Sequence, residues 1–276
     1  MKNNCLNCNE PLSGKFCSFC GQISSVKRIE LIQLIKDLPH AIFHVDSGIF
    51  YNFKQLVLRP SMAIYDYLIG KRKPFFHPVT YLALALIFNY LAVKITGLHY
   101  YDQEELKTMS EKQASVILAY DESQWWFLEH TYQYMLLAIS LSTLFLFIFL
   151  KFMKHNFNLS ETIIIVLFTI AQGVIFQSLI YFSFGWIRSG VLIRGIETVN
   201  IVILFLYASY VIYGLFKINQ QRFSKLTLGI LSLVAGGGLL AIMVWSAYLL
   251  YDFSHWTCLC LMSSQSKSEV DRKPFK

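Results

Sequence analysis

Charged side chains are scarce in this chain. Asp, Glu, Lys and Arg together make up 15% of its 276 residues, whereas soluble domains carry roughly 25%. Hydrophobic residues make up 55% and aromatic residues 16% of the chain. This composition excludes an ordinary soluble domain and predicts an integral membrane protein.

The residue patterns of enzyme active sites are also missing from the apolar part of the chain. We find no nucleophile beside a base, no pair of carboxylates, no phosphate-binding glycine loop and no metal-binding set of histidines. The sequence therefore favours a protein that is not an enzyme. A membrane-embedded enzyme acting on lipid stays open as an alternative, because folding could bring distant polar residues together.

No apolar run opens the chain. Met1 to Arg28 is polar and rich in cysteine, without the apolar region of a signal peptide, so we expect a cytoplasmic N-terminus. The net charge of +7 could indicate nucleic acid as a partner. In membrane proteins, however, basic residues gather in cytoplasmic loops and meet lipid head groups. We expect membrane lipids as partners and consider nucleic acid unlikely, since Lys2 and Lys15 near Glu10 are too few to bind phosphates.

The cysteines are few but strongly patterned. Four of the six form two Cys-x-x-Cys pairs near the start of the chain: Cys5, Cys8, Cys17 and Cys20. Two such pairs complete the four-sulfur shell that Zn²⁺ prefers in closed structural sites, and a reducing cytoplasm disfavours disulfides. The pattern predicts a zinc ribbon over residues 1–24 that folds with its metal, with Phe16 covering one side of the ion. Cys258 and Cys260 are expected to be ordinary apolar residues.

A helical juxtamembrane neck is predicted over residues 25–76. Ile29 to Val45 has the spacing of an amphipathic helix, and a second helix is expected to begin near Pro60 and to stop at Gly70. The basic cluster that follows consists of Lys71, Arg72 and Lys73. It is typical of an orientation anchor that contacts lipid head groups, and a lipid-regulation site is the alternative.

Two stretches of this region resemble a known family. The knuckle "FCSFCGQ" and the segment "RPSMAIYDYLIGKRKPFFHPVTYL" are similar to uncharacterised bacterial envelope proteins, which join an N-terminal zinc ribbon to several membrane helices and are catalogued as a domain of unknown function. The resemblance implies a protein of the bacterial inner membrane and implies no activity.

The remainder is predicted to be an all-α polytopic bundle over residues 77–256, followed by a polar tail over 257–276. A membrane helix needs about 20 mainly apolar residues. Five segments qualify: Pro78 to Ile95, Thr131 to Phe152, Thr162 to Phe184, Ile196 to Phe216 and Leu226 to Tyr251. Basic residues precede the first span and follow the second and fourth, whereas the connection at about 98–130 is acidic and is expected to be periplasmic. The basic tail fits this odd number of spans poorly, so the alternative stays open that one of the five segments is a hairpin or lies on the membrane surface.

Polar residues inside the spans allow two interpretations. They are Asn89, Gln172, Gln177 and Asn200, joined by the glycine triplet around Gly237. Amides and glycines are typical of close helix packing, which we favour. A pathway for a small solute, with a helix broken at the glycines, is the alternative.

We therefore expect a membrane scaffold or accessory subunit that uses a cytosolic structural zinc ribbon to dock a protein partner. A small-solute permease or channel is the alternative.

Overall fold

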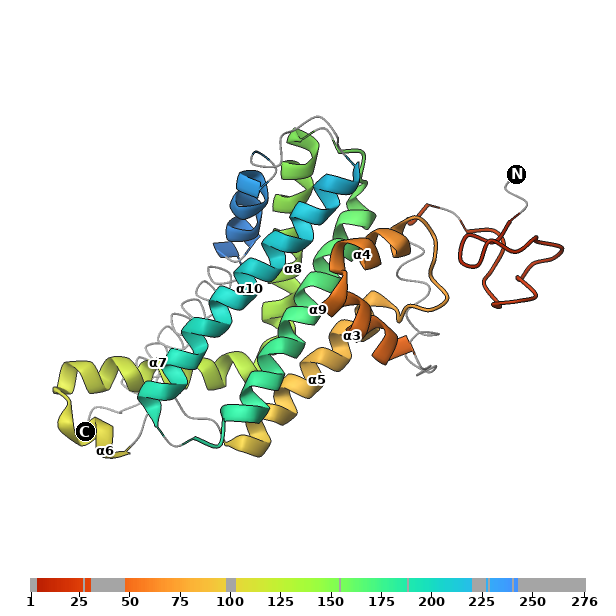
Figure 1. Cartoon of the computed structure of the whole chain (residues 1–276). Helices are drawn as coiled ribbons and strands as arrows, with labels where there is room; N and C mark the ends of the chain where they lie inside the picture. The colour runs from red at the N-terminus through yellow and green to blue at the C-terminus, as the bar shows by residue number, and fades with distance from the viewer. Residues whose placement is uncertain are drawn as a thin grey trace, which may run out of the picture.

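The computed structural model describes residues 4–26, 28–30, 48–97, 103–153, 155–187, 189–219, 227, 229–239 and 241–242. Within these residues the protein is all-helical apart from the ribbon, which has only isolated bridges and no strand. The ribbon lies beside one end of a long helical bundle (Figure 1). Most of the amphipathic segment predicted from Ile29 to Val45 falls outside the described residues, as do Cys258, Cys260 and the polar tail.

Four helices are long and apolar enough to cross a membrane: α5 (Pro78–Thr96), α8 (Thr131–Phe152), α9 (Leu159–Phe184) and α10 (Gly190–Asn219). They confirm four of the five predicted spans and an all-α membrane protein. The fifth prediction is described only in part, as the apolar helix Gly229–Leu239.

Helix α9 lies at the centre of the bundle and contacts α5, α8 and α10. Its Ile164, Ile165 and Phe168 side chains are almost fully buried. A capping box starts the helix: the Asn158 side chain accepts from the Glu161 amide, and the Glu161 carboxylate accepts from the Asn158 amide. Glu161 therefore stabilises the start of α9.

Two short helices, α3 (Gly48–Leu58) and α4 (Pro60–Leu68), pack against α9 and α10. The Tyr207 hydroxyl donates to the Leu56 carbonyl at 3.1 Å, and the Ser61 hydroxyl donates to the Val211 carbonyl at 3.0 Å. Together with the loop that follows, they carry the chain from the ribbon to the start of α5 (Figure 1).

The far end of the bundle carries α6 (Gln103–Thr108) and α7 (Glu111–Glu129), and α7 crosses that end at a steep angle to the spans (Figure 1). A capping box of Ser110 and Gln113 starts α7. The Lys94 ammonium lies 4.7 Å from the centre of the Trp125 ring, which links α5 to α7. This connection was predicted to be periplasmic, and its side of the membrane stays a prediction.

The glycine triplet lies where the helix Gly229–Leu239 packs closely on its neighbours. A side chain at Gly236 would collide with Ser209 of α10, and one at Gly238 would collide with the Phe145 ring of α8. At Gly237 the nearest atom of another residue belongs to Phe205, at 3.4 Å from an added Cβ. The two outer glycines therefore allow close packing, in agreement with the favoured interpretation of the triplet.

Candidate metal centre

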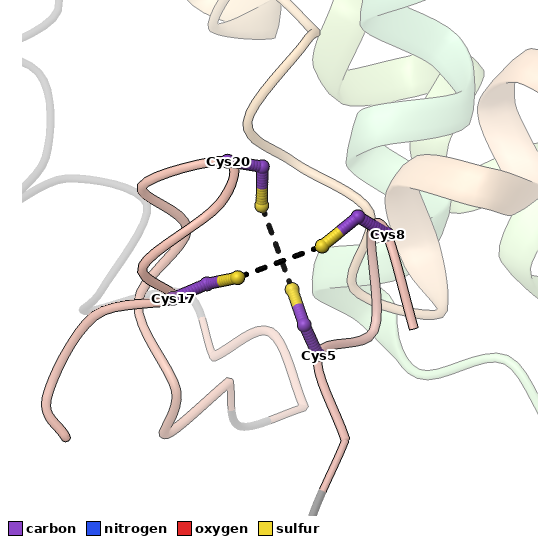
Figure 2. A group of neighbouring side chains, drawn as sticks. All are labelled: Cys5, Cys8, Cys17 and Cys20. Carbon is purple, nitrogen blue, oxygen red and sulfur yellow. Dashed lines mark hydrogen bonds between the residues drawn. The ribbon is translucent and has the colours of Figure 1, made fainter. Parts of the chain in front are cut away.

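Four cysteine sulfurs converge on one point in the ribbon (Figure 2). All lie within 4.8 Å of one another; Cys5 Sγ is 3.6 Å from Cys20 Sγ, and Cys8 Sγ is 3.5 Å from Cys17 Sγ. A disulfide would need about 2.05 Å, whereas a tetrahedral shell with metal–sulfur distances of about 2.3 Å has edges of roughly 3.8 Å. The geometry therefore fits four separate ligands around one metal ion.

The two Cys-x-x-Cys knuckles repeat each other in backbone structure. In the first, the Cys5 amide donates to the Glu10 carbonyl at 2.8 Å and the Asn9 amide donates to the Cys5 carbonyl at 2.9 Å. Twelve residues further on, Cys17, Gly21 and Gln22 make the same two bonds with the same lengths. Each knuckle is thus a hairpin that aims two sulfurs inward, and the sequence already shows this repeat as "CLNCNE" and "CSFCGQ".

A left-handed residue closes each knuckle. Asn9 has φ 64° and Gly21 has φ 72°, and both follow the second cysteine of their pair. Glycine reaches this region without strain, and asparagine tolerates it better than most residues do. The two positions explain why neither knuckle continues as a helix.

The pKa values of the neighbouring cysteine thiols differ widely. Burial raises the pKa of Cys20, but the Gln22 amide, the Asn7 side chain and the neighbouring thiols outweigh it and lower that pKa to about 6. The Glu10 amide lowers the pKa of Cys8, yet desolvation and the other three thiols raise it to about 12. A metal ion bound by the four sulfurs would favour the thiolate form of each, including Cys8.

Phe16 does not cover the metal site, so that expectation was wrong. Its side chain is 62% exposed. It lies in the bridge that pairs Phe16 with Ile23 and points its ring to the surface. Cys5 and Cys17 are the most buried of the four cysteines, and Cys8 and Cys20 are half-buried.

The second knuckle is docked on the loop that precedes α5. The Gln22 side chain is buried, and its Oε1 accepts from the Arg72 amide at 3.1 Å and from the Lys73 amide at 3.3 Å. Close by, Gly70 has φ 112°, and an added Cβ there would lie within 3 Å of the Leu6 and Val26 side chains. The contact therefore needs glycine at this position for both its backbone and its lack of a side chain.

The basic cluster predicted to meet lipid head groups forms much of this docking loop. Lys71 Nζ pairs with Asp66 at 2.8 Å, and the Arg72 guanidinium lies 5.9 Å from the centre of the Tyr67 ring. Lys73 is exposed. Two of the three charges thus bind within the protein, and the contact with lipid stays a prediction.

A second contact fixes the segment just after the ribbon to the start of α9. Arg28 binds Glu161 through two bonds, Nε to Oε1 at 2.7 Å and Nη2 to Oε2 at 2.8 Å, and it donates to the Asn156 carbonyl at 2.5 Å. The hydrogen bond and charge of Glu161 raise the pKa of Arg28. The Asn158 side chain also donates to the Ile29 carbonyl at 3.1 Å. The bundle therefore holds the ribbon through Gln22 and the segment after it through Arg28 and Ile29.

The polar residues proposed as a solute pathway have different hydrogen-bond partners, and the pathway stays a prediction. Gln172 accepts a bond from the Tyr81 hydroxyl at 2.7 Å, and Gln177 donates to the Tyr181 hydroxyl at 2.6 Å. Asn89 and Asn200 each have a buried side-chain atom without a hydrogen-bond partner among the described residues. No hydrogen bond joins the four amides to one another within that part of the chain, and Gly237 contacts a phenylalanine instead.

Residues 46–89 match the sequence model of a family described as "Protein of unknown function (DUF3667)". The chain carries a DUF3667 domain. The match confirms the resemblance to a domain of unknown function. The DUF3667 domain contains α3, α4, the docking loop and the first part of α5, so it supplies the surface that receives the ribbon. No curated protein and no solved structure matches the chain.

Proposed function

We propose that the protein is a membrane scaffold or accessory subunit that docks a protein partner through the ribbon, with Zn²⁺ as the structural metal. The observation that carries this proposal is a groove of about 600 Å³ between the first knuckle and the DUF3667 domain. Its lining residues are Asn4, Cys5, Leu6, Asn7, Cys8, Asn9 and Lys71. Lys71 of the docking loop completes a lining that the first knuckle otherwise supplies.

The chemistry of the groove suits a polypeptide segment. Three asparagine amides offer both donors and acceptors, and the Lys71 ammonium adds a donor beside them. Such groups can bind the main chain of an extended segment, whose amides and carbonyls need partners on both sides. The closed four-sulfur shell leaves no coordination position for catalysis, which favours a docking role over an enzymatic one.

We place the ribbon in the cytoplasm of a bacterial cell, with the bundle in the inner membrane. Support comes from the family resemblance and from basic residues in connections at the ribbon's end of the bundle, such as Lys71, Lys73 and Lys151. Positive charge concentrates in cytoplasmic segments. A reducing compartment also keeps the four cysteines available for metal.

A bulky residue in the groove tests the proposal. Asn4→Trp should fill the groove, whereas Ser13→Trp places the same ring on an exposed loop that does not line it. After crosslinking in native membranes, the band of the protein joined to its partner should be absent for Asn4→Trp and for metal-free Cys5→Ser. The same band should be present for Ser13→Trp. Unchanged bands in all three variants, at normal protein levels, would overturn the docking role.

The alternative, a small-solute permease, has one observation in its favour. Buried amide atoms of Asn89, Gln172 and Asn200 lack hydrogen-bond partners among the described residues, and water inside the bundle could satisfy them. Liposomes holding the purified protein should then take up solute, and Gln172→Leu should slow the uptake. Liposomes that stay impermeable to small solutes and ions would remove this alternative.

A further inference from the structure

The two knuckles have the same backbone but very different surfaces. Phe16, Phe19 and Ile23 of the second knuckle are 62%, 77% and 50% exposed. We call these three residues the apolar triad. The equivalent positions of the first knuckle, twelve residues earlier, hold Asn4, Asn7 and Pro11.

The apolar triad is not needed to fold the metal site. The first knuckle makes the same backbone bonds and brings the same two sulfurs inward with polar or small residues at those positions. Three exposed large apolar side chains on a module this small therefore point to a ligand outside the ribbon.

The attachment of the ribbon fixes where that ligand lies. Gln22, next to Ile23 in the chain, accepts hydrogen bonds from the Arg72 and Lys73 amides. The membrane-crossing helix α5 begins at Pro78, five residues after Lys73, which is at most about 17 Å of extended chain. A turn closed by the Phe75 amide and the Arg72 carbonyl, at 3.1 Å, shortens this path. A head-group layer is roughly 5–8 Å thick, so the second knuckle lies close to the membrane surface.

Basic residues flank the apolar triad. Lys15 directly precedes Phe16 and is exposed. The Lys73 side chain runs along the second knuckle, since its Cε lies 3.7 Å from a Cβ added at Gly21. Aromatic and aliphatic tips with neighbouring lysines are the combination that binds an anionic bilayer surface.

From these observations we infer that the apolar triad inserts into the head-group layer of the membrane that α5 crosses, with Lys15 and Lys73 against anionic lipid. The ribbon then has two working faces. The second knuckle contacts lipid, and the first knuckle keeps its groove open to the aqueous side.

A photoreactive side chain tests this directly. p-Benzoylphenylalanine replaces Phe19 in the full-length protein, and in a matched variant it replaces Pro11, the exposed equivalent of Ile23. The probe membrane is a nanodisc of phosphatidylcholine and phosphatidylglycerol. We expect position 19 to yield lipid adducts after irradiation and position 11 to yield few. Replacing phosphatidylglycerol with phosphatidylcholine should lower the yield by about fivefold for each lysine that contacts the surface.

A second variant separates loss of the apolar surface from unfolding of the ribbon. Phe16→Asn, Phe19→Asn and Ile23→Pro together give the second knuckle the surface of the first. This variant should keep its metal, and trypsin should cut it faster after Lys15 in nanodiscs but not in detergent. Equal lipid adducts at positions 11 and 19, or adducts from position 19 to protein alone in native membranes, would overturn the inference. So would an unchanged cleavage rate in nanodiscs.

Discussion

The ribbon and the bundle are held together by different forces. In the ribbon, Cys5 and Cys17 are the only described apolar side chains up to Ser24 that are buried, and the large ones around them, such as Phe19, face outward. The bundle instead buries Phe168, Phe216 and many aliphatic residues in one core. Within its described residues the ribbon therefore has almost no apolar core of its own, whereas the bundle depends on packing. A substitution that unfolds one of the two parts should therefore leave the other part folded.

Removal of one cysteine should give the largest effect. Structural zinc supplies about 10–16 kcal/mol to small zinc peptides, so Cys8→Ser should abolish metal binding and unfold the ribbon. The bundle should keep its thermal unfolding temperature. Elemental analysis, trypsin cleavage after Lys15 and unfolding in detergent would measure the three quantities. Cys258→Ser is the control for losing a thiol, and full metal content in Cys8→Ser would contradict the four-sulfur site.

A methyl group at a closely packed glycine of the bundle should destabilise the bundle and leave the ribbon intact. In Gly236→Ala the new Cβ meets the backbone and side chain of Ser209, so the helix must shift, at a cost of about 3 kcal/mol in unfolding free energy. Metal content should stay unchanged. Gly229→Ala is the matched control, because nothing lies within 4 Å of its Cβ. If both variants unfold alike in detergent, the helix Gly229–Leu239 is not closely packed there.

The ion pair between the two parts should have an intermediate effect. The Glu161 side chain is only 8% exposed, whereas that of Arg28 is 59% exposed, so solvent screens part of the pair. Arg28→Met should leave a nearly buried carboxylate with one partner fewer and destabilise the start of α9 by about 2 kcal/mol. Hydrogen exchange of the first turn of α9 would report it. Lys54→Met, on α3, controls for the lost charge, and equal exchange in the two variants would argue against the pair.

The smallest expected effect concerns the docking amide. Gln22→Ala removes an acceptor for the Arg72 and Lys73 amides and should cost about 1 kcal/mol. Metal content should not change, but exchange at those two amides should rise. Glu10 is the equivalent residue of the first knuckle and is exposed, so Glu10→Ala should have no effect. A loss of metal in Gln22→Ala would show that the contact and the metal site are one unit.

The sequence predicted the cysteine cluster and four of the apolar spans because both leave local patterns. Two Cys-x-x-Cys pairs fix a ligand set, and runs of apolar residues such as α8 fix a membrane helix. Pro60 and Gly70 marked the region of α4 correctly, since proline suits the first turn of a helix and glycine the residue beyond its end.

The attachments between the parts could not be predicted in the same way. Arg28 and Glu161 are separated by 133 positions, and either one alone resembles an ordinary surface charge. One signal in the sequence could have pointed to Gln22. The two knuckles repeat each other, but Gln22 has an amide where the equivalent Glu10 has a carboxylate. Phe16 was expected to cover one side of the metal because it directly precedes Cys17, but its side chain is exposed.

Gly70 has a consequence for how this architecture could vary. An added Cβ at Gly70 would meet both Leu6 and Val26. Gly70→Ala should therefore separate the ribbon from the docking loop without changing a cysteine or a membrane span. Such a change would leave the ribbon connected to the bundle by the chain alone. It offers a way to ask whether this protein needs a ribbon in one fixed orientation.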